Sequence, residues 1–159
     1  MTTALELRKR GAVFVLDGSP SAASLRPHRG LRGAEITVDG RTVAIGPTDH
    51  RPCGVVTADG LLRLHPQDGR TPAGEPVAWS LRPERGSYRA AVVRAGQGDD
   101  DRIDLRLPRL GGRVVEISVS GAWADLELLV LAASFALLAR RRGDRVRAAI
   151  VAGAIGHGH

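Results

Sequence analysis

Five arginines near the C-terminus are the residues best suited to a chemical role. They are Arg140, Arg141, Arg142, Arg145 and Arg147. Guanidinium groups bind phosphate and carboxylate groups through paired hydrogen bonds. Two interpretations stay open at this point. The arginines either cap a helix and hold its end in water, or they contact anionic lipid headgroups, where each basic residue contributes about 1 kcal/mol.

Four aspartates form a weak candidate site for a metal ion. They are Asp99, Asp100, Asp101 and Asp104. Carboxylate oxygens suit a hard cation such as Ca²⁺, but these residues lack the spacing of a calcium-binding loop, so an exposed hairpin tip is the favoured interpretation. His157 and His159, on a glycine-rich tail, form a weaker pair still. The sequence therefore predicts no metal site and no cofactor.

No residue pattern in the chain is typical of an enzyme. His28, His50 and His65 lie beside proline or arginine, and no serine or aspartate can be assigned to them as a catalytic partner. The glycine-rich motifs of nucleotide-binding loops do not occur in the sequence. Cys53, the only cysteine, excludes an intrachain disulfide and is expected to pack as a small hydrophobic residue. The sequence predicts a non-enzymatic protein.

The composition indicates a single domain with an aliphatic core. The chain has 159 residues, of which 43% are hydrophobic and 3% aromatic, and this suits one domain of ordinary size. Most of the formal net charge of +6 falls on the arginine cluster, whereas a nucleic-acid-binding domain spreads its basic residues along a face, so nucleic acid is not favoured as a partner. The apolar run at 12–16 is too short for a secretion signal, and we expect a cytoplasmic protein, free or peripheral to the membrane.

Alternating apolar and polar residues predict short antiparallel strands over most of the chain. The segments AEITVDGRTVAI (34–45) and GVVTADGLLRL (54–64) each carry Asp-Gly near the centre, which is typical of a hairpin with a type I′ turn. Further strands are expected at 5–10, 12–16, 24–26, 77–82, 87–95, 102–107 and 113–120, and a loop at 65–76. Roughly eight to twelve short strands with closely spaced turns favour a barrel or a sandwich.

The segment AWADLELLVLAASFALLARRRG (122–143) changes to the pattern of a helix. Asp125 lies near the expected start and Gly143 just after the expected end, so the helix is predicted at about 124–142. Its uncharged run, 128–139, spans roughly 18 Å, well short of the about 30 Å hydrocarbon core of a membrane. A helix that is apolar on all sides must then be surrounded by its own protein.

These patterns together predict a mainly β protein, a closed or nearly closed antiparallel β-barrel with a buried hydrophobic C-terminal α-helix. The helix residues expected in the core are Leu128, Leu131, Ala133, Phe135 and Leu138. Residues 1–142 form the single expected barrel domain, and residues 143–159 a basic and apolar tail. Within that tail, VRAAIVAGAIG (146–156) is a candidate second short helix, either packed on the barrel or laid on a membrane.

The order of these features resembles the tubby C-terminal-like superfamily, which includes phospholipid scramblases and LURP-one-related proteins. The specific part is RVVEISVSG (113–121), then AWAD (122–125), then the apolar helix. The resemblance implies a closed twelve-stranded barrel around a central hydrophobic helix, without enzymatic activity, and lipid, phosphoinositide or nucleic-acid contacts are described for different members. Two features depart from the pattern: the chain continues beyond the helix, and the strands expected before residue 70 are fewer than the family requires.

The sequence therefore predicts a non-enzymatic binding protein of tubby-like or scramblase-like fold that contacts anionic lipid or another anionic ligand. The alternative is a small membrane-anchored protein, with a cytoplasmic β-domain and a hydrophobic anchor at 122–156. In that case the arginines fix the orientation of the anchor in the membrane.

Overall fold

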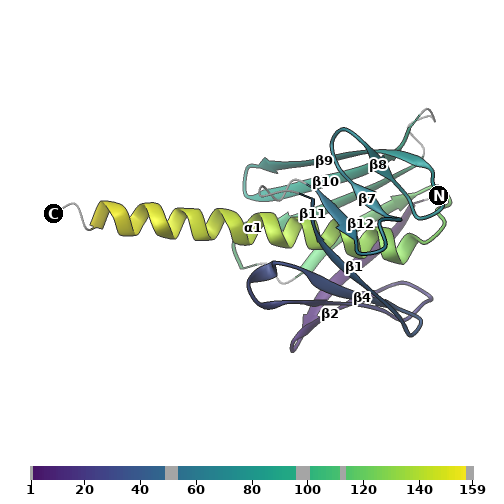
Figure 1. The fold of residues 1–159 in the computed structure, drawn as a ribbon, viewed down its shortest axis with the longest axis horizontal. Helices are drawn as coiled ribbons and strands as arrows, with labels where there is room; N and C mark the ends of the chain where they lie inside the picture. The colour runs from purple at the N-terminus through teal and green to yellow at the C-terminus, as the bar shows by residue number, and fades with distance from the viewer. Residues whose placement is uncertain (1, 49–53, 96–100, 112–113, 157–159) are drawn as a thin grey trace.

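The structure, a computed structural model, describes residues 2–48, 54–95, 101–111 and 114–156. Within these residues the chain forms twelve strands, a short 3₁₀ turn (Arg29–Leu31) and one long helix, α1 (Leu126–Gly156). Figure 1 shows α1 running through the strands and then projecting from one end. The strands are β1 (Thr2–Arg10), β2 (Val13–Asp17), β3 (Ala23–Pro27), β4 (Ala34–Val38), β5 (Arg41–Pro47), β6 (Val55–Thr57), β7 (Arg63–Leu64), β8 (Gly69–Arg70), β9 (Pro76–Glu84), β10 (Ser87–Arg94), β11 (Arg102–Pro108) and β12 (Val114–Ser120).

The strands close into an antiparallel barrel in which neighbours along the chain are neighbours in space. The first and last strands complete the ring: β1 pairs with β12 in a register that sets Leu5 opposite Ile117 and Leu7 opposite Val115. Closure gives every strand two partners and removes the open sheet edges on which other chains could pair. The predicted fold class is confirmed.

Alternation of side chains along the strands places one face in the core. In β11, Ile103, Leu105 and Leu107 are buried, as predicted from their spacing, while the charged residues between them point outward. β12 repeats the pattern with Val115, Ile117 and Val119. A ring of such strands presents apolar side chains to the barrel axis from all directions.

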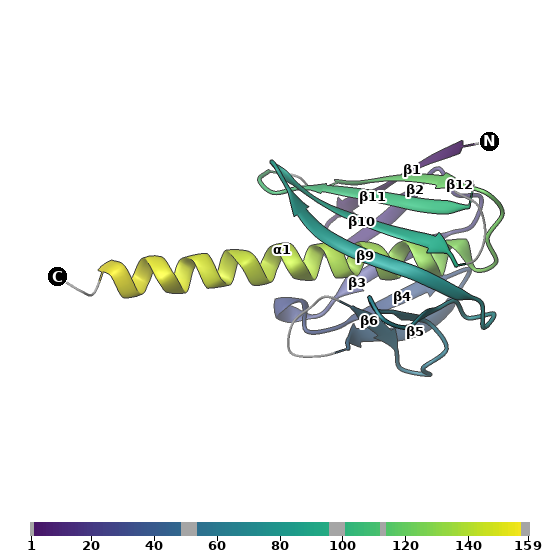
Figure 2. The same cartoon turned by 90° about the horizontal axis from the view of Figure 1, so that it is seen from above.

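The first part of α1 fills this axis. Residues 129–139 are buried without interruption, and the two orthogonal views of Figures 1 and 2 both place them inside the barrel. Leu131, Ala133, Phe135 and Leu138 are core residues as predicted, whereas Leu128 is only half-buried because it lies where the helix enters the barrel. Small residues in this part let the strands approach the helix from every side.

The predicted end of the helix is wrong. Helix α1 does not stop before Gly143 but continues without a break to Gly156, so the candidate second helix at 146–156 is its outer half. This half projects beyond the barrel instead of packing on it (Figures 1 and 2). A glycine inside a helix costs about 1 kcal/mol relative to alanine. The alanines and arginines that follow Gly143 are good helix formers and offset that cost.

The two Asp-Gly hairpins form, but their turns differ. Asp39 (φ 49°) and Gly40 (φ 82°) adopt the predicted type I′ conformation between β4 and β5. Between β6 and β7 only Gly60 has a positive φ. There the carboxylate of Asp59 accepts hydrogen bonds from the Thr57 hydroxyl (2.6 Å) and the Leu61 amide (3.0 Å), which builds a wider turn.

One strand lies in the segment predicted to be a loop. Strand β8 has only two residues, too few for any periodicity to reveal, and pairs with β7 and β9. Gly69 permits this pairing, because a Cβ atom there would lie 2.5 Å from the carbonyl oxygen of Val77. With short strands such as β8 included, eight strands of the described chain precede residue 76, and twelve strands close the barrel.

Candidate functional site

Helix α1 leaves the barrel where the chain turns between β1 and β2, β3 and β4, β9 and β10, and β11 and β12. We call this the exit end and the opposite one the far end. Two arginines fasten the helix here: Nη1 of Arg141 donates to the carbonyl of Pro108 at 3.0 Å, and Nη2 of Arg145 to that of Arg109 at 2.9 Å. The amide of Arg109 donates to the carbonyl of Gly86 at 3.1 Å, which joins two of the turns.

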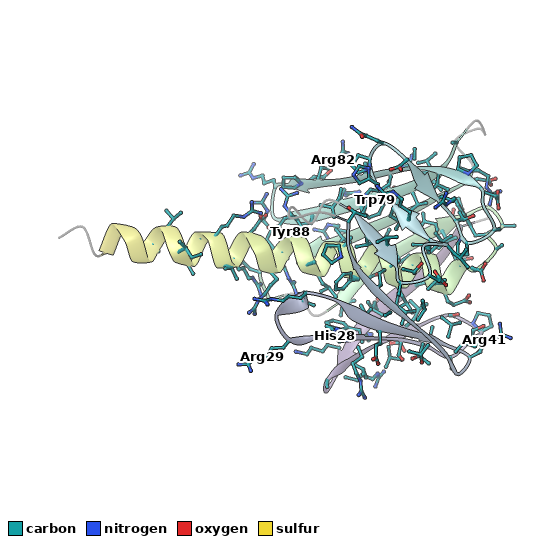
Figure 3. All side chains as sticks on the ribbon, viewed as in Figure 1. His28, Arg29, Arg41, Trp79, Arg82 and Tyr88 are labelled. Atoms are coloured by element: carbon teal, nitrogen blue, oxygen red, sulfur yellow. The ribbon has the colours of Figure 1, made fainter. Side chains whose placement is uncertain are left out.

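Cations from the strand ends and turns add to the charge of the exit end. They include Lys9, Arg29, Arg85 and Arg109. Figure 3 shows Arg29 at this end, and the guanidinium of Arg109 lies over the ring of Tyr88, 5.3 Å from its centroid. Sequence reasoning missed these residues because they are widely spaced along the chain. The signal that groups them is the up-and-down strand order, which brings alternate turns to the same end.

The far end carries acidic turns. Its acids include Asp39, Asp59, Glu75, Asp101 and Asp125, and the cations described among them include Arg41 and Arg94. Arg41 lies at the opposite end of the barrel from Arg29 in Figure 3. Arg94 is compensated, since it forms ion pairs with Asp101 at 2.9 Å and Glu75 at 3.3 Å. The exit end also holds acids, since Glu84 pairs with Arg89 at 2.6 Å and Asp68 with Arg63 at 3.0 Å, but its cations outnumber them. On balance the barrel is polarised along its axis, basic at the exit end and acidic at the far end.

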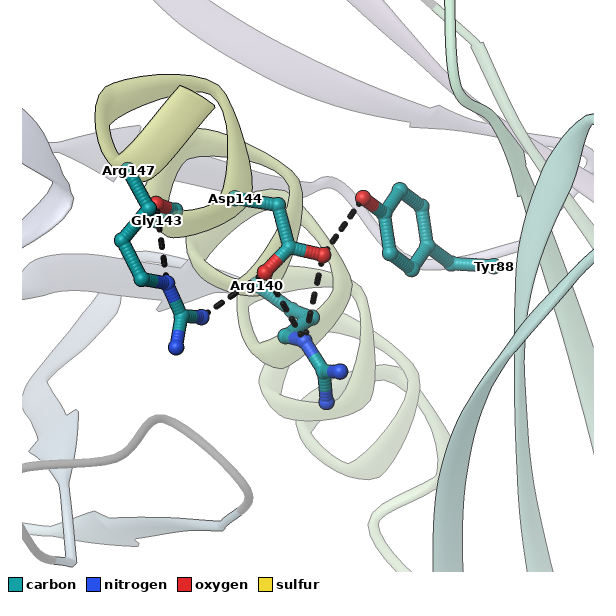
Figure 4. Close-up of polar contacts among 5 residues, drawn as sticks. All are labelled: Tyr88, Arg140, Gly143, Asp144 and Arg147. Atoms are coloured by element: carbon teal, nitrogen blue, oxygen red, sulfur yellow. Dashed lines mark hydrogen bonds and ion pairs between the residues drawn. The ribbon is translucent and has the colours of Figure 1, made fainter. Parts of the chain in front are cut away.

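Asp144 connects α1 to the barrel wall and binds two of the predicted arginines (Figure 4). The hydroxyl of Tyr88, from β10, donates to Oδ2 of Asp144 at 2.7 Å. Nε of Arg140 lies 3.3 Å from both carboxylate oxygens, and Nη2 of Arg147 lies 2.7 Å from Oδ1. Burial by itself raises the pKa of Asp144, but the Tyr88 hydrogen bond and the two guanidinium groups outweigh it and hold the pKa below its usual value.

The five predicted arginines are brought together as a collar around α1 where it leaves the barrel. We use arginine collar for Arg140, Arg141, Arg142, Arg145 and Arg147. Asp144 compensates part of its charge through the ion pairs with Arg140 and Arg147. The carbonyl partner of Arg145 is neutral and leaves the charge of that arginine in place. Burial and the nearby Arg145 lower the pKa of Arg141, as expected for a cation among cations.

Exposed apolar side chains accompany these cations. On the projecting half of α1, Val146 is 43% exposed, Ile150 65% and Val151 58%, and in the turn after β11 Leu110 is 84% exposed. The remaining large hydrophobic residue of this kind in the described chain, Leu61, lies in the turn between β6 and β7. Contiguous exposed apolar surface beside polar residues commonly marks a contact with a membrane or another molecule.

The other candidate residues do not gather into a site in the described chain. Asp101 pairs with Arg94, and Asp104 accepts two hydrogen bonds from Arg102, at 2.7 and 2.8 Å. Asp99 and Asp100 lie outside the described residues, as do His50, Cys53, His157 and His159. In the part of the chain that is described, no three His, Cys, Asp or Glu side chains are placed to hold a metal ion.

The two remaining histidines lie in turns near the exit end. Nδ1 of His65 accepts a hydrogen bond from the amide of Gln67 at 3.2 Å and faces Asp68 at the same distance. The amide of His28 donates to the carbonyl of Gly33 at 2.8 Å and closes the turn between β3 and β4. The imidazole makes the contacts in His65, whereas in His28 the backbone makes them.

Over the described ranges, α1 included, no helix has the length and the apolar character needed to cross a membrane. No protein-family model, curated protein or solved structure matches the chain. The architecture, a closed twelve-stranded antiparallel barrel with a C-terminal helix, is consistent with the tubby-like fold without identifying it.

Proposed function

We propose that this chain is a non-enzymatic binding protein of tubby-like fold that docks end-on on an anionic lipid surface. The observation that carries the proposal is the coincidence of cations and exposed apolar side chains at one end of a polarised barrel. The arginine collar and the turn cations meet the headgroups, and the projecting half of α1 enters the surface layer. The far end, with its acidic turns, faces away from the negative charge.

The energies suit reversible docking. Each basic residue near an anionic surface contributes about 1 kcal/mol, so a few uncompensated arginines are enough for specific attraction. Burial of Val146, Ile150 and Val151 adds roughly 1 to 2 kcal/mol for each side chain, since they are only partly exposed before contact. Residues 148–156 carry no charge, and at about 1.5 Å per residue they span roughly 13 Å, a depth close to that of interfacial helices.

The barrel around α1 supports the tubby-like assignment, because the resemblance implies this arrangement of strands and helix. The barrel encloses residues 129–139, so the part of α1 that takes part in the proposed contact is its outer half. A nucleic-acid partner would engage the cations but not Ile150 and Val151, and lipid therefore accounts for more of the exit end.

The proposal is tested by flotation with vesicles of phosphatidylcholine, with or without phosphatidylglycerol. The test variant is Arg29→Ala/Arg85→Ala/Arg142→Ala, which removes three exposed arginines from the exit end. Its matched control, Arg41→Ala/Arg70→Ala/Arg102→Ala, removes the same charge near the far end. We expect binding to the anionic vesicles alone, weakened about 100-fold in the test variant, at about 1 kcal/mol per arginine, and little changed in the control.

Equal weakening of the two variants would show attraction by net charge and overturn end-on docking. Absence of binding to anionic vesicles would overturn the function itself. High salt should release the bound protein, since exposed charges are screened. Protein that resists both salt and alkaline extraction would instead support the anchored alternative at 122–156.

A further inference from the structure

A groove of about 660 Å³ opens beside α1 at the exit end. The helix forms one wall, and the turns between β1 and β2 and between β3 and β4 form the other. Its cationic side chains are Lys9, Arg141, Arg142 and Arg145, and none of the described residues that line it is acidic. Lys9 continues the inward row of Leu5 and Leu7 along β1, so it stands at the mouth of the barrel, facing the helix side.

Part of the groove lining is apolar. Phe14 and Leu138 are core residues that reach its lining, so its floor is continuous with the hydrophobic core. Leu31 and Val146 form apolar walls nearer to solvent. Pockets of this size, with an apolar lining and a few convergent polar groups, suit small organic ligands.

No acidic side chain is among the described residues of the groove lining. Asp144, the acid within the arginine collar, lies outside the lining and is engaged by Tyr88, Arg140 and Arg147. Burial of Arg141, together with repulsion from the guanidinium of Arg145, lowers the pKa of Arg141. An anion in the groove would relieve this repulsion, and an alkyl chain would cover the apolar floor.

We infer that the groove binds one anionic phospholipid, with its phosphate among Lys9, Arg141 and Arg142 and its chain against Phe14 and Leu138. The inference rests on the proposed function, because the docked exit end faces the surface that supplies this ligand. It adds a saturable site for a single molecule to a contact that otherwise depends on the whole surface. A ligand with only an anionic group or only an apolar chain would contact just part of the groove lining.

The test uses dihexanoyl phosphatidic acid below its micelle concentration, with amide shifts of Ala12, Leu31 and Ala149 as readout. Inorganic phosphate and dihexanoyl phosphatidylcholine are titrated in parallel. We expect saturation by phosphatidic acid alone, since phosphate lacks the chain and phosphatidylcholine has no net charge. Equal saturation by inorganic phosphate would overturn the lipid site and leave a simple anion site. Absence of saturation by phosphatidic acid would overturn the inference entirely.

Ala149→Trp fills the groove without changing its charge, and Ala148→Trp is the matched control on the neighbouring helix position, outside the lining. Both residues are exposed, so both variants should fold, which circular dichroism checks. We expect Ala149→Trp to weaken phosphatidic acid binding about tenfold or more, and Ala148→Trp to leave it within about twofold. Native affinity in Ala149→Trp would overturn the groove as the site. Flotation of the native protein with anionic vesicles reports separately on the proposed function.

Discussion

Asp144 shows how one carboxylate can position a helix and restrain two arginines at once. Removal of its neutral partner by Tyr88→Phe should destabilise the fold by about 1.5 kcal/mol near neutral pH, because the lost hydrogen bond ends on a charged acceptor. The pKa of Asp144 is lowered in the folded protein, so its contribution is present above about pH 4 and is lost as the pH falls through the folded pKa.

At alkaline pH the stabilising contribution of the Tyr88–Asp144 contact declines as the pH rises. Burial first, and then Asp144, raise the pKa of Tyr88, so its contribution is complete below about pH 10 and declines as the pH rises beyond that value. Urea unfolding of the native protein and of Tyr88→Phe should therefore differ most between about pH 5 and pH 9. A difference that stayed constant down to pH values near 3 would contradict the role given to Asp144.

The buried hydroxyl of Ser134 gives a second prediction at the scale of single residues. It is 0% exposed in the part of α1 that lies inside the barrel, and its hydroxyl has no hydrogen-bond partner among the described residues. Ser134→Ala should raise the free energy of unfolding by up to about 1 kcal/mol, since an unsatisfied buried hydroxyl is removed. Ser118→Ala, on the outer face of β12, is the control and should stay within about 0.5 kcal/mol. Loss of stability in Ser134→Ala would mean that the hydroxyl is satisfied in solution.

At the scale of elements, α1 has two halves with opposite tolerance for charge. Ala133→Arg introduces an unpaired cation inside the barrel and should prevent folding, because burying such a charge is very costly. Ala148→Arg makes the same change on the projecting half and should alter the stability by no more than about 0.5 kcal/mol. Near-ultraviolet circular dichroism and urea unfolding distinguish the outcomes. A folded barrel in Ala133→Arg would place the helix outside it.

The elements that could be predicted are those with a period or a local marker. Strand β11 could be predicted from the alternation of Ile103, Leu105 and Leu107. The first hairpin could be predicted because Asp39-Gly40 is typical of a type I′ turn. Helix α1 was predicted from its apolar run, but its end was not, because Gly143 is a local cue and the residues beyond it continue the helix. Two-residue strands such as β8 are too short for any period to appear.

The candidate site was predictable only where its residues are adjacent in the chain. The arginine collar is a sequence cluster and could be named at once. Lys9 and Arg85 belong to the exit end only because the strand order brings their hairpins there. The hydrogen bond from Tyr88 to Asp144 joins residues 56 positions apart. Neither segment carries a sequence pattern that predicts this contact.

At the scale of the whole molecule, the polarity of the barrel determines how it should approach a charged surface. Acidic turns at the far end and cations at the exit end give the molecule a dipole along α1, so under the proposed docking an anionic surface would orient it before contact. In that orientation the projecting half of α1 would reach the surface first. Orientation and insertion are therefore two consequences of one arrangement, and they can be measured together.

Tryptophan substitutions at the two ends test this orientation. Ile150→Trp lies on the projecting half of α1, and Leu61→Trp, its matched control, replaces a similarly exposed hydrophobic residue in the turn between β6 and β7. With anionic vesicles whose acyl chains carry bromine, we expect fluorescence quenching for Ile150→Trp well above that of the native tryptophans, and none beyond it for Leu61→Trp, because only the exit end enters the lipid. Equal quenching would mean that the barrel lies on its side, and the dipole would then not set its orientation.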